Sequence, residues 1–101
     1  MDMKITKEQF LKDLAKGWKG IKFLKERFFD TDWDEDTKFT ASCAIGAACY
    51  GSTGSKKSLH AYLRALPGSM ENQIIDANND SRSKAEVTRK IAALTWPRVT
   101  A

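Results

Sequence analysis

The chain has few of the residues that build disulfide frameworks, metal centres and membrane spans. Its 101 residues include two cysteines, two prolines and one histidine, and its apolar runs are only a few residues long. One histidine and two cysteines do not supply the paired ligands of a zinc site, and no run is long enough to span a bilayer. No segment resembles a signal peptide. We therefore expect a cytoplasmic protein with reduced cysteines, no cofactor and no metal.

Acidic residues are missing from residues 38–68, which contain four lysines or arginines. Residues 1–29 are also basic, with eight Lys/Arg and four Asp/Glu. The acidic residues gather between these two regions, at Asp30, Asp32, Asp34, Glu35 and Asp36. With a net charge of +4, the chain is predicted to present a mostly basic surface interrupted by one acidic loop.

Length and apolar spacing predict one compact, all-α domain of four to five short helices over residues 1–101, with a core from about residue 5 to residue 96. The first helix begins at a capping box formed by Thr6 and Gln9. Apolar side chains then recur at helical spacing as far as residue 28. Gly17 and Gly20 interrupt this run, so either one helix bends there or two shorter helices meet. No alternating pattern typical of strands is present.

Four further segments carry helical signals. A helix of small residues begins at Thr40 or Ser42 and ends near Gly51, before a polar linker over residues 51–55. The other three helices are expected from Ser58 to before Pro67, over residues 69–77 with a turn at 78–80, and from the capping box of Ser83 and Glu86 to before Trp96.

Cys43 opens the helix of small residues, where unpaired backbone N–H groups and the helix dipole favour a thiolate. A buried structural thiol is the commoner case. Cys49 cannot bridge to Cys43 along one helix, because their rise of roughly 9 Å exceeds the ~7 Å that a disulfide spans. A nucleophile also needs a base and an orienting group, and His60 with Asn79 or Asp80 supplies these residue types in chain order. A cysteine-dependent hydrolase or transferase is therefore one alternative function.

The acidic loop alternates its aspartates from Asp30 to Asp36 as an EF-hand calcium loop does. It has Glu35 where that loop needs glycine and Ala41 where it needs a bidentate glutamate. We interpret it as a solvated loop that pairs with basic residues beside it, and we leave cation binding open. Trp33 within the loop either packs on the core or is exposed as a binding anchor.

Lysines occur along the first helical run at positions 12, 16, 19, 22 and 25, largely on its solvent side. Together with Trp18 and Phe23 they would hold nucleic acid through phosphate contacts and base stacking. Such a surface would extend to Lys56, Lys57 and Arg64. Nucleic-acid binding is therefore a second alternative, although lysines opposite an apolar face also serve simply to keep a helix soluble.

Three short motifs resemble the landmarks of a recurrent small domain family of bacteria, notably actinobacteria, and of phages. They are Gly17-Trp18, Cys43-Ala44-Ile45-Gly46-Ala47, and Asn79-Asp80 followed by Ala85-Glu86-Val87. The family is of uncharacterised function, and the resemblance covers about residues 8–94. It implies a compact helical fold in which the Cys-Ala-Ile-Gly-Ala helix packs against the Asn-Asp turn. It transfers no active site, and the chain departs from the family at residues 30–36 and at Lys56-Lys57.

Segregated charge without a complete catalytic set favours a small non-enzymatic binding protein. Phages and mobile elements encode such proteins to modulate or inhibit a host complex. We expect the partner to be a host protein or protein complex and not a membrane, and we leave the oligomeric state open. The predicted contact residues are Lys12, Lys16 and Lys19 on the first helix, and Asp30, Asp32, Trp33, Asp34, Glu35 and Asp36 in the acidic loop.

Overall fold

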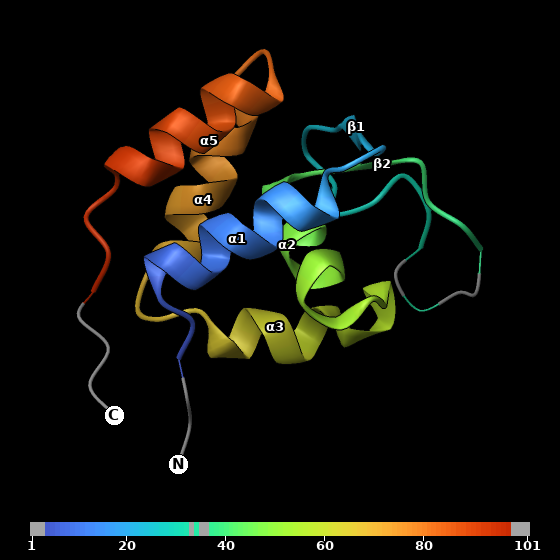
Figure 1. Ribbon diagram of the computed structural model, residues 1–101, viewed down its shortest axis with the longest axis horizontal. Coiled ribbons are helices and arrows are strands. Elements are labelled where there is room, and N and C mark those ends of the chain that lie inside the picture. The colour runs from blue at the N-terminus through green and yellow to red at the C-terminus, as the bar shows by residue number, and fades with distance from the viewer. Residues whose placement is uncertain (1–3, 33, 35–36, 98–101) are drawn as a thin grey trace.

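The computed structural model of this chain describes residues 4–32, 34 and 37–97 (Figure 1). Within these residues the fold is mostly helical, as predicted, but it is not purely α-helical. The helices are α1 (Lys7–Gly17), α2 (Ala44–Thr53), α3 (Leu59–Ala65), α4 (Met70–Asn79) and α5 (Lys84–Ala93), with a short 3-10 turn, η1 (Lys56–Ser58), before α3. Two strands of two residues each, β1 (Lys22–Phe23) and β2 (Ala41–Ser42), pair in parallel.

The strand pair corrects the prediction that the domain contains only helices. Lys22 lies opposite Ala41, and Phe23 lies opposite Ser42. The Leu24 N–H donates to the Ser42 carbonyl at 3.0 Å, which extends the pairing by one bond. Strands of two residues are too short to show an alternating pattern, so they could not be predicted from residue spacing.

The first helix ends at Gly17, and the prediction that helical structure continues toward residue 28 is wrong. Trp18 follows as the C-cap, and its ring turns into the core, where it is 5 % exposed. The indole Nε1 donates to the Ser42 carbonyl at 3.0 Å, so Trp18 joins α1 to β2. Gly20 then adopts a φ of 78°, a left-handed conformation that glycine tolerates best. The apolar side chains beyond it are spaced as in a helix but belong to a loop and a strand.

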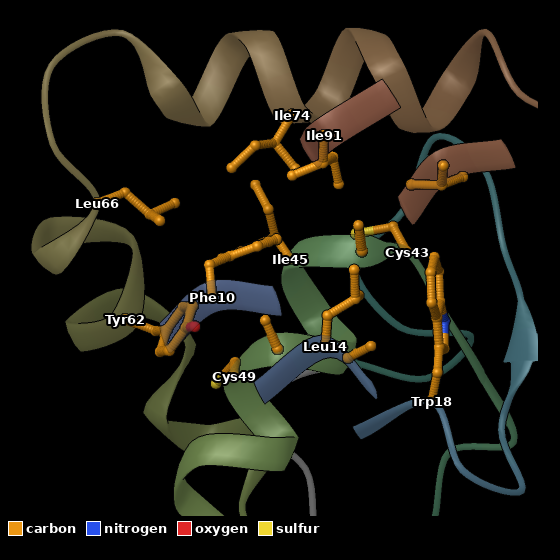
Figure 2. Packing of buried hydrophobic residues seen from close by; sticks show 14 of the residues in the cluster. Phe10, Leu14, Trp18, Cys43, Ile45, Cys49, Tyr62, Leu66, Ile74 and Ile91 are labelled. Atoms are coloured by element: carbon orange, nitrogen blue, oxygen red, sulfur yellow. The ribbon is translucent and has the colours of Figure 1, made fainter. Parts of the chain in front are cut away.

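Helix α2 lies at the centre of the molecule, and its Ala44, Ile45, Ala47, Ala48 and Cys49 are all fully buried (Figure 2). Its small residues let α1 approach until the two backbones touch. A Cβ on Gly17 of α1 would overlap the Ala47 carbonyl oxygen, and a Cβ on Gly51 of α2 would overlap the Asp13 carbonyl oxygen. The helix of small residues is therefore a core helix, packed against α1, α3 and α4.

Both predicted capping boxes have their N-cap bond. The Thr6 hydroxyl accepts from the Gln9 N–H at 3.1 Å, and the Ser83 hydroxyl accepts from the Glu86 N–H at 3.2 Å. Three predicted boundaries were wrong by a few residues. The N-cap of α2 is Cys43 and not Thr40 or Ser42, because Ser42 belongs to β2. Helix α2 runs on to Thr53 with Gly54 as its C-cap, and α4 includes residues 78 and 79, which we expected in a turn. In the described part of the chain, every helix is too short or too polar to cross a bilayer.

Candidate functional site

Cys43 is the N-cap of α2 and is 6 % exposed. Burial raises the pKa of its thiol to about 11, although the backbone N–H groups of Ile45 and Gly46 partly offset this effect. About one molecule in ten thousand would then carry the thiolate at pH 7. Cys43 lies at a helix start, as predicted. The desolvation that raises its pKa outweighs the helix dipole that would lower it. Cys43 thus has the ionisation of a structural thiol and not that of a nucleophile.

Asn78 and Asn79 hold backbone around the start of α2. Asn78, which is 1 % exposed, accepts from the Ala44 N–H at 2.9 Å through Oδ1 and donates from Nδ2 to the Leu24 carbonyl at 3.0 Å. Asn79 Oδ1 accepts from the Glu26 N–H at 2.9 Å, at a residue whose φ is 66°. These amides fasten the N-terminus of α2, the end of α4 and the segment after β1 to one another.

The other members of the predicted triad lie elsewhere. His60 is an exposed residue of α3. Helix α2, which has ten residues and is roughly 15 Å long, lies between Cys43 and His60 in the chain. Asp80 forms an ion pair of 3.4 Å with Lys90 of α5. The structure therefore does not bring Cys43, His60 and Asn79 or Asp80 together as a catalytic triad.

A small pocket of about 160 Å³ opens beside Cys43. Its wall is mainly apolar and is formed by Phe28, Cys43, Ile45, Ile74 and Ile75, with Glu26, Arg27, Asn78 and Asn79 at its edge. Its volume matches that of an apolar cavity that holds one benzene-sized group. It offers shape and apolar contact, but burial keeps the thiol in its wall neutral at pH 7.

Asp30, the first aspartate of the acidic loop, forms hydrogen bonds to other residues of the protein. The Asp30 carboxylate accepts from the Thr40 N–H at 2.8 Å, the Thr40 hydroxyl at 2.7 Å and the Ala41 N–H at 3.1 Å. Desolvation raises the pKa of Asp30, but these hydrogen bonds outweigh it and hold the pKa below its ordinary value. Asp32 and Asp34 are exposed. The remaining predicted contact residues of the loop, Trp33, Glu35 and Asp36, lie outside the described residues.

Of the basic residues flanking this loop, Lys56 is nearly buried. It is 7 % exposed, and its ammonium donates to the hydroxyls of Thr31 at 2.6 Å and Thr37 at 3.3 Å. Lys56 thus fastens the loop to η1 and is not part of an open basic surface. Lys57 and Arg64 are exposed, as the nucleic-acid alternative requires.

The three lysines predicted as contact residues on the first helix are all exposed. Lys19, two residues beyond the end of α1, lines a groove between α1 and α5, whereas Lys12 is not among the residues that line it. Lys16 borders a separate hollow beside Tyr50, which is 38 % exposed. The structure therefore brings Lys19 together with α5 and turns Lys16 toward α2.

We call the first of these hollows the α1–α5 groove. It has a volume of about 600 Å³ and is lined by Ala15, Trp18, Lys19, Lys84, Ala85, Thr88, Arg89 and Ala92. Among the described residues, no acidic side chain lines it. Its floor is largely alanine, and three cations, Lys19, Lys84 and Arg89, stand at its edge.

Two lysines fix the width of this groove. Lys84, at the start of α5, donates to the carbonyl of Trp18 at the end of α1, at 2.8 Å. Lys7, at the start of α1, donates to the carbonyl of Ala92 at the end of α5, at 2.9 Å. The two helices thus run antiparallel and are joined at both ends, as their directions in Figure 1 also show.

The acidic residue of α5 faces away from the groove. Glu86 pairs with Lys90 at 3.5 Å, and Lys90 also reaches Asp80 beyond the end of α4. Val87 and Ile91 of the same helix are fully buried in the core. The groove face of α5 is therefore separate from both its core face and its ion-pair face. This face was not predicted, although Ala85, Thr88 and Ala92 recur at helical spacing.

No protein-family model, curated protein sequence or solved structure matches this chain. Its resemblance to the small helical domain family therefore stays a prediction. The candidate functional site rests on geometry alone, and we take the α1–α5 groove, with its three cations, as that site.

Proposed function

We propose that this chain is a small binding protein without catalytic activity, and that it recognises an acidic surface of a macromolecular partner through the α1–α5 groove. A host protein complex that the chain modulates or inhibits remains our proposal for the partner. The observation that carries this function is the groove itself, with three cations around an apolar floor and no acidic residue among the described ones that line it. Such charge complementarity speeds association and selects partners.

A protein partner is favoured over nucleic acid by the character of the groove floor. Single-stranded nucleic acid is held by aromatic side chains on which bases stack. Trp18, the aromatic residue of the groove, is only 5 % exposed, and the Lys84 ammonium lies 5.9 Å from the centre of its ring. The alanines offer apolar contact to protein side chains instead. The raised thiol pKa of Cys43 supports no hydrolase or transferase proposal.

The experiment compares capture of partners from a bacterial lysate by three immobilised proteins. The first is the wild type, the second carries Lys19→Glu and Arg89→Glu, and the third carries the matched changes Lys25→Glu and Arg64→Glu at exposed positions outside the groove. Each protein is tested with nuclease-treated lysate and with untreated lysate. The two variants have the same net charge, so any difference between them reports position.

We expect a protein that the wild type and the Lys25/Arg64 variant retain and that the Lys19/Arg89 variant loses. Equal loss in both variants would show that net charge alone causes capture and would overturn the assignment to the groove. A partner that disappears on nuclease treatment would identify nucleic acid as the ligand. Capture unchanged in both variants would exclude the groove as the binding surface.

A further inference from the structure

We propose that the occupant of the α1–α5 groove is an amphipathic α-helix of the partner protein. Small apolar side chains would lie on the face that this helix buries, with carboxylates along its two edges. The inference rests on the proposed function, because it names the part of the partner that the same groove receives.

The frame of the groove is two antiparallel helices joined by hydrogen bonds. Lys84 and Lys7 join the helices at both ends, by the 2.8 Å and 2.9 Å bonds to the carbonyls of Trp18 and Ala92. A third helix laid between two neighbours is the usual way in which an amphipathic helix is bound in a groove. An extended strand would instead need unpaired backbone groups to bind, and both of these carbonyls already accept hydrogen bonds.

The floor of the groove admits a helix closely. Ala85 and Ala92 of α5 are exposed and lie two helical turns apart, roughly 11 Å, and Ala15 of α1 is exposed opposite them. None of the three has a side chain beyond Cβ, so a partner helix can approach the backbones of both α1 and α5. The spacing of Ala85 and Ala92 matches about two turns of a helix laid along the groove.

The cations lie where the edges of such a helix would pass. Lys19 stands on the α1 side, and Lys84 and Arg89 stand on the α5 side, at helical positions flanking Ala85. Lys84 uses one of its three donors on the Trp18 carbonyl, so two remain for a carboxylate. Arg89 is exposed and presents a planar fork that pairs with a carboxylate through two parallel bonds. This arrangement selects glutamates or aspartates on both flanks of the bound helix.

The probe is a synthetic, end-blocked peptide of about 14 residues, roughly 21 Å as a helix. It carries alanine and leucine on one face and glutamate on both flanks. A second peptide of the same charge has a central proline that breaks the helix, and a thymidine oligonucleotide of similar length is the third probe. Binding is measured by titration calorimetry, and the bound surface is mapped by backbone amide shifts in NMR.

The test variant is Ala85→Arg, which adds a positive charge but fills the floor with a long side chain. Arginine is a good helix former and Ala85 is exposed, so the fold is retained. The control is Ala61→Arg, the same change at an exposed position of α3 outside the groove. If the floor receives a helix, Ala85→Arg weakens binding. If charge alone attracts the ligand, the same variant strengthens it.

We expect the helical peptide to bind the wild type, with amide shifts at Ala15, Ala85 and Ala92. We expect Ala85→Arg to weaken this binding roughly tenfold, and Ala61→Arg to leave it unchanged. The proline-containing peptide and the oligonucleotide should bind more weakly than the helical peptide.

Three results would overturn the inference. Equal binding of the two peptides, both strengthened by Ala85→Arg, would leave the acidic-partner function standing but remove the helix. Preferential binding of the oligonucleotide would make the ligand a nucleic acid. The wild type could also self-associate, as measured by light scattering. If Ala85→Arg abolishes this association, the occupant of the groove is a second copy of this chain. The proposed function is tested separately, because it fails if the lysate capture does not distinguish the Lys19/Arg89 variant from the Lys25/Arg64 variant.

Discussion

The N-terminal end of α2 and the α1–α5 groove use their polar groups in opposite ways. At α2, Asn78 is fully buried and bonded to two backbone groups, and the thiol of Cys43 is held neutral by burial. In the groove, Lys19 and Arg89 are exposed above alanines. The residue types that suggest chemistry thus serve the fold, whereas common surface residues are left available for a partner. Changes at the first region should alter the free energy of unfolding, and changes at the second should alter binding.

The largest effect is expected where α1 and α2 touch. Gly17→Ala places a Cβ against the Ala47 carbonyl oxygen, so the helices must separate. We expect the free energy of unfolding to fall by about 3 kcal/mol or more, measured by urea denaturation. Gly54→Ala is the matched control, because its Cβ would meet nothing within 4 Å and only its φ of 74° opposes the change. It should cost about 1 kcal/mol, and an equal loss in both variants would contradict the close contact.

The next effect concerns the buried Cys43 thiol at alkaline pH. Its pKa is raised by burial from an ordinary value of 9.0 to about 11, so the unfolded chain releases its proton first. The stability from the neutral thiol is fully present below pH 9 and is lost as the pH rises through 11. This amounts to roughly 3 kcal/mol. The check is the free energy of unfolding against pH for the wild type and for Cys43→Ser, which lacks the titrating group. Parallel curves would show that the Cys43 thiol ionises normally in the folded protein.

Asn78→Ala should lower the free energy of unfolding by about 2–3 kcal/mol, because the Ala44 N–H and the Leu24 carbonyl each lose a buried partner. Asn72→Ala, at an exposed position of the same helix, is the control and should change it by less than about 0.5 kcal/mol. Thermal and urea denaturation provide the comparison. Equal stability of the two variants would mean that the amide of Asn78 does not hold the start of α2.

A smaller effect is expected in the acidic loop. Asp30→Ala removes the acceptor for Thr40 and Ala41, which should cost about 1 kcal/mol, whereas Asp32→Ala at an exposed position should cost little. Because hydrogen bonds lower the pKa of Asp30, its contribution is present above the carboxyl's ordinary pKa and is lost as the pH falls through the lowered value. The difference in stability between the two variants should therefore vanish in acid. A difference that persists there would show that the charge of Asp30 is not what matters.

The smallest effect on stability is expected in the groove. Lys19→Glu together with Arg89→Glu should change the free energy of unfolding by less than about 0.5 kcal/mol, because both side chains are exposed. Urea denaturation measures this directly. A large loss would mean that the groove cations support the fold, and the contrast between the two regions would disappear.

Structural features that join neighbouring residues were predictable from the sequence, and features that join distant residues were not. The N-caps at Thr6 and Ser83 are local, since each joins residues three positions apart, and both were predicted. Gly17 was recognised as an interruption of the first helix. Its contact with Ala47 was not, because that contact joins residues far apart in the chain.

The candidate site was predictable only in part for the same reason. Lys19 was predicted as a contact residue, a prediction that stays untested, and Lys84 and Arg89 join it in the groove only because α1 and α5 pack antiparallel. Cys43 was correctly placed at a helix start, yet its ionisation depends on burial by distant residues such as Ile74 of α4. A spacing pattern specifies the helix and its faces, but not which face remains uncovered.

The measurement that tests the central claim most directly is capture of the partner by Cys43→Ser beside the Lys19→Glu, Arg89→Glu variant. Serine removes the thiol while retaining the shape of the N-cap side chain. We predict that Cys43→Ser retains the partner as the wild type does, while the charge-reversed groove loses it. Loss of the partner from Cys43→Ser with retention by the groove variant would contradict the account and assign function to the start of α2.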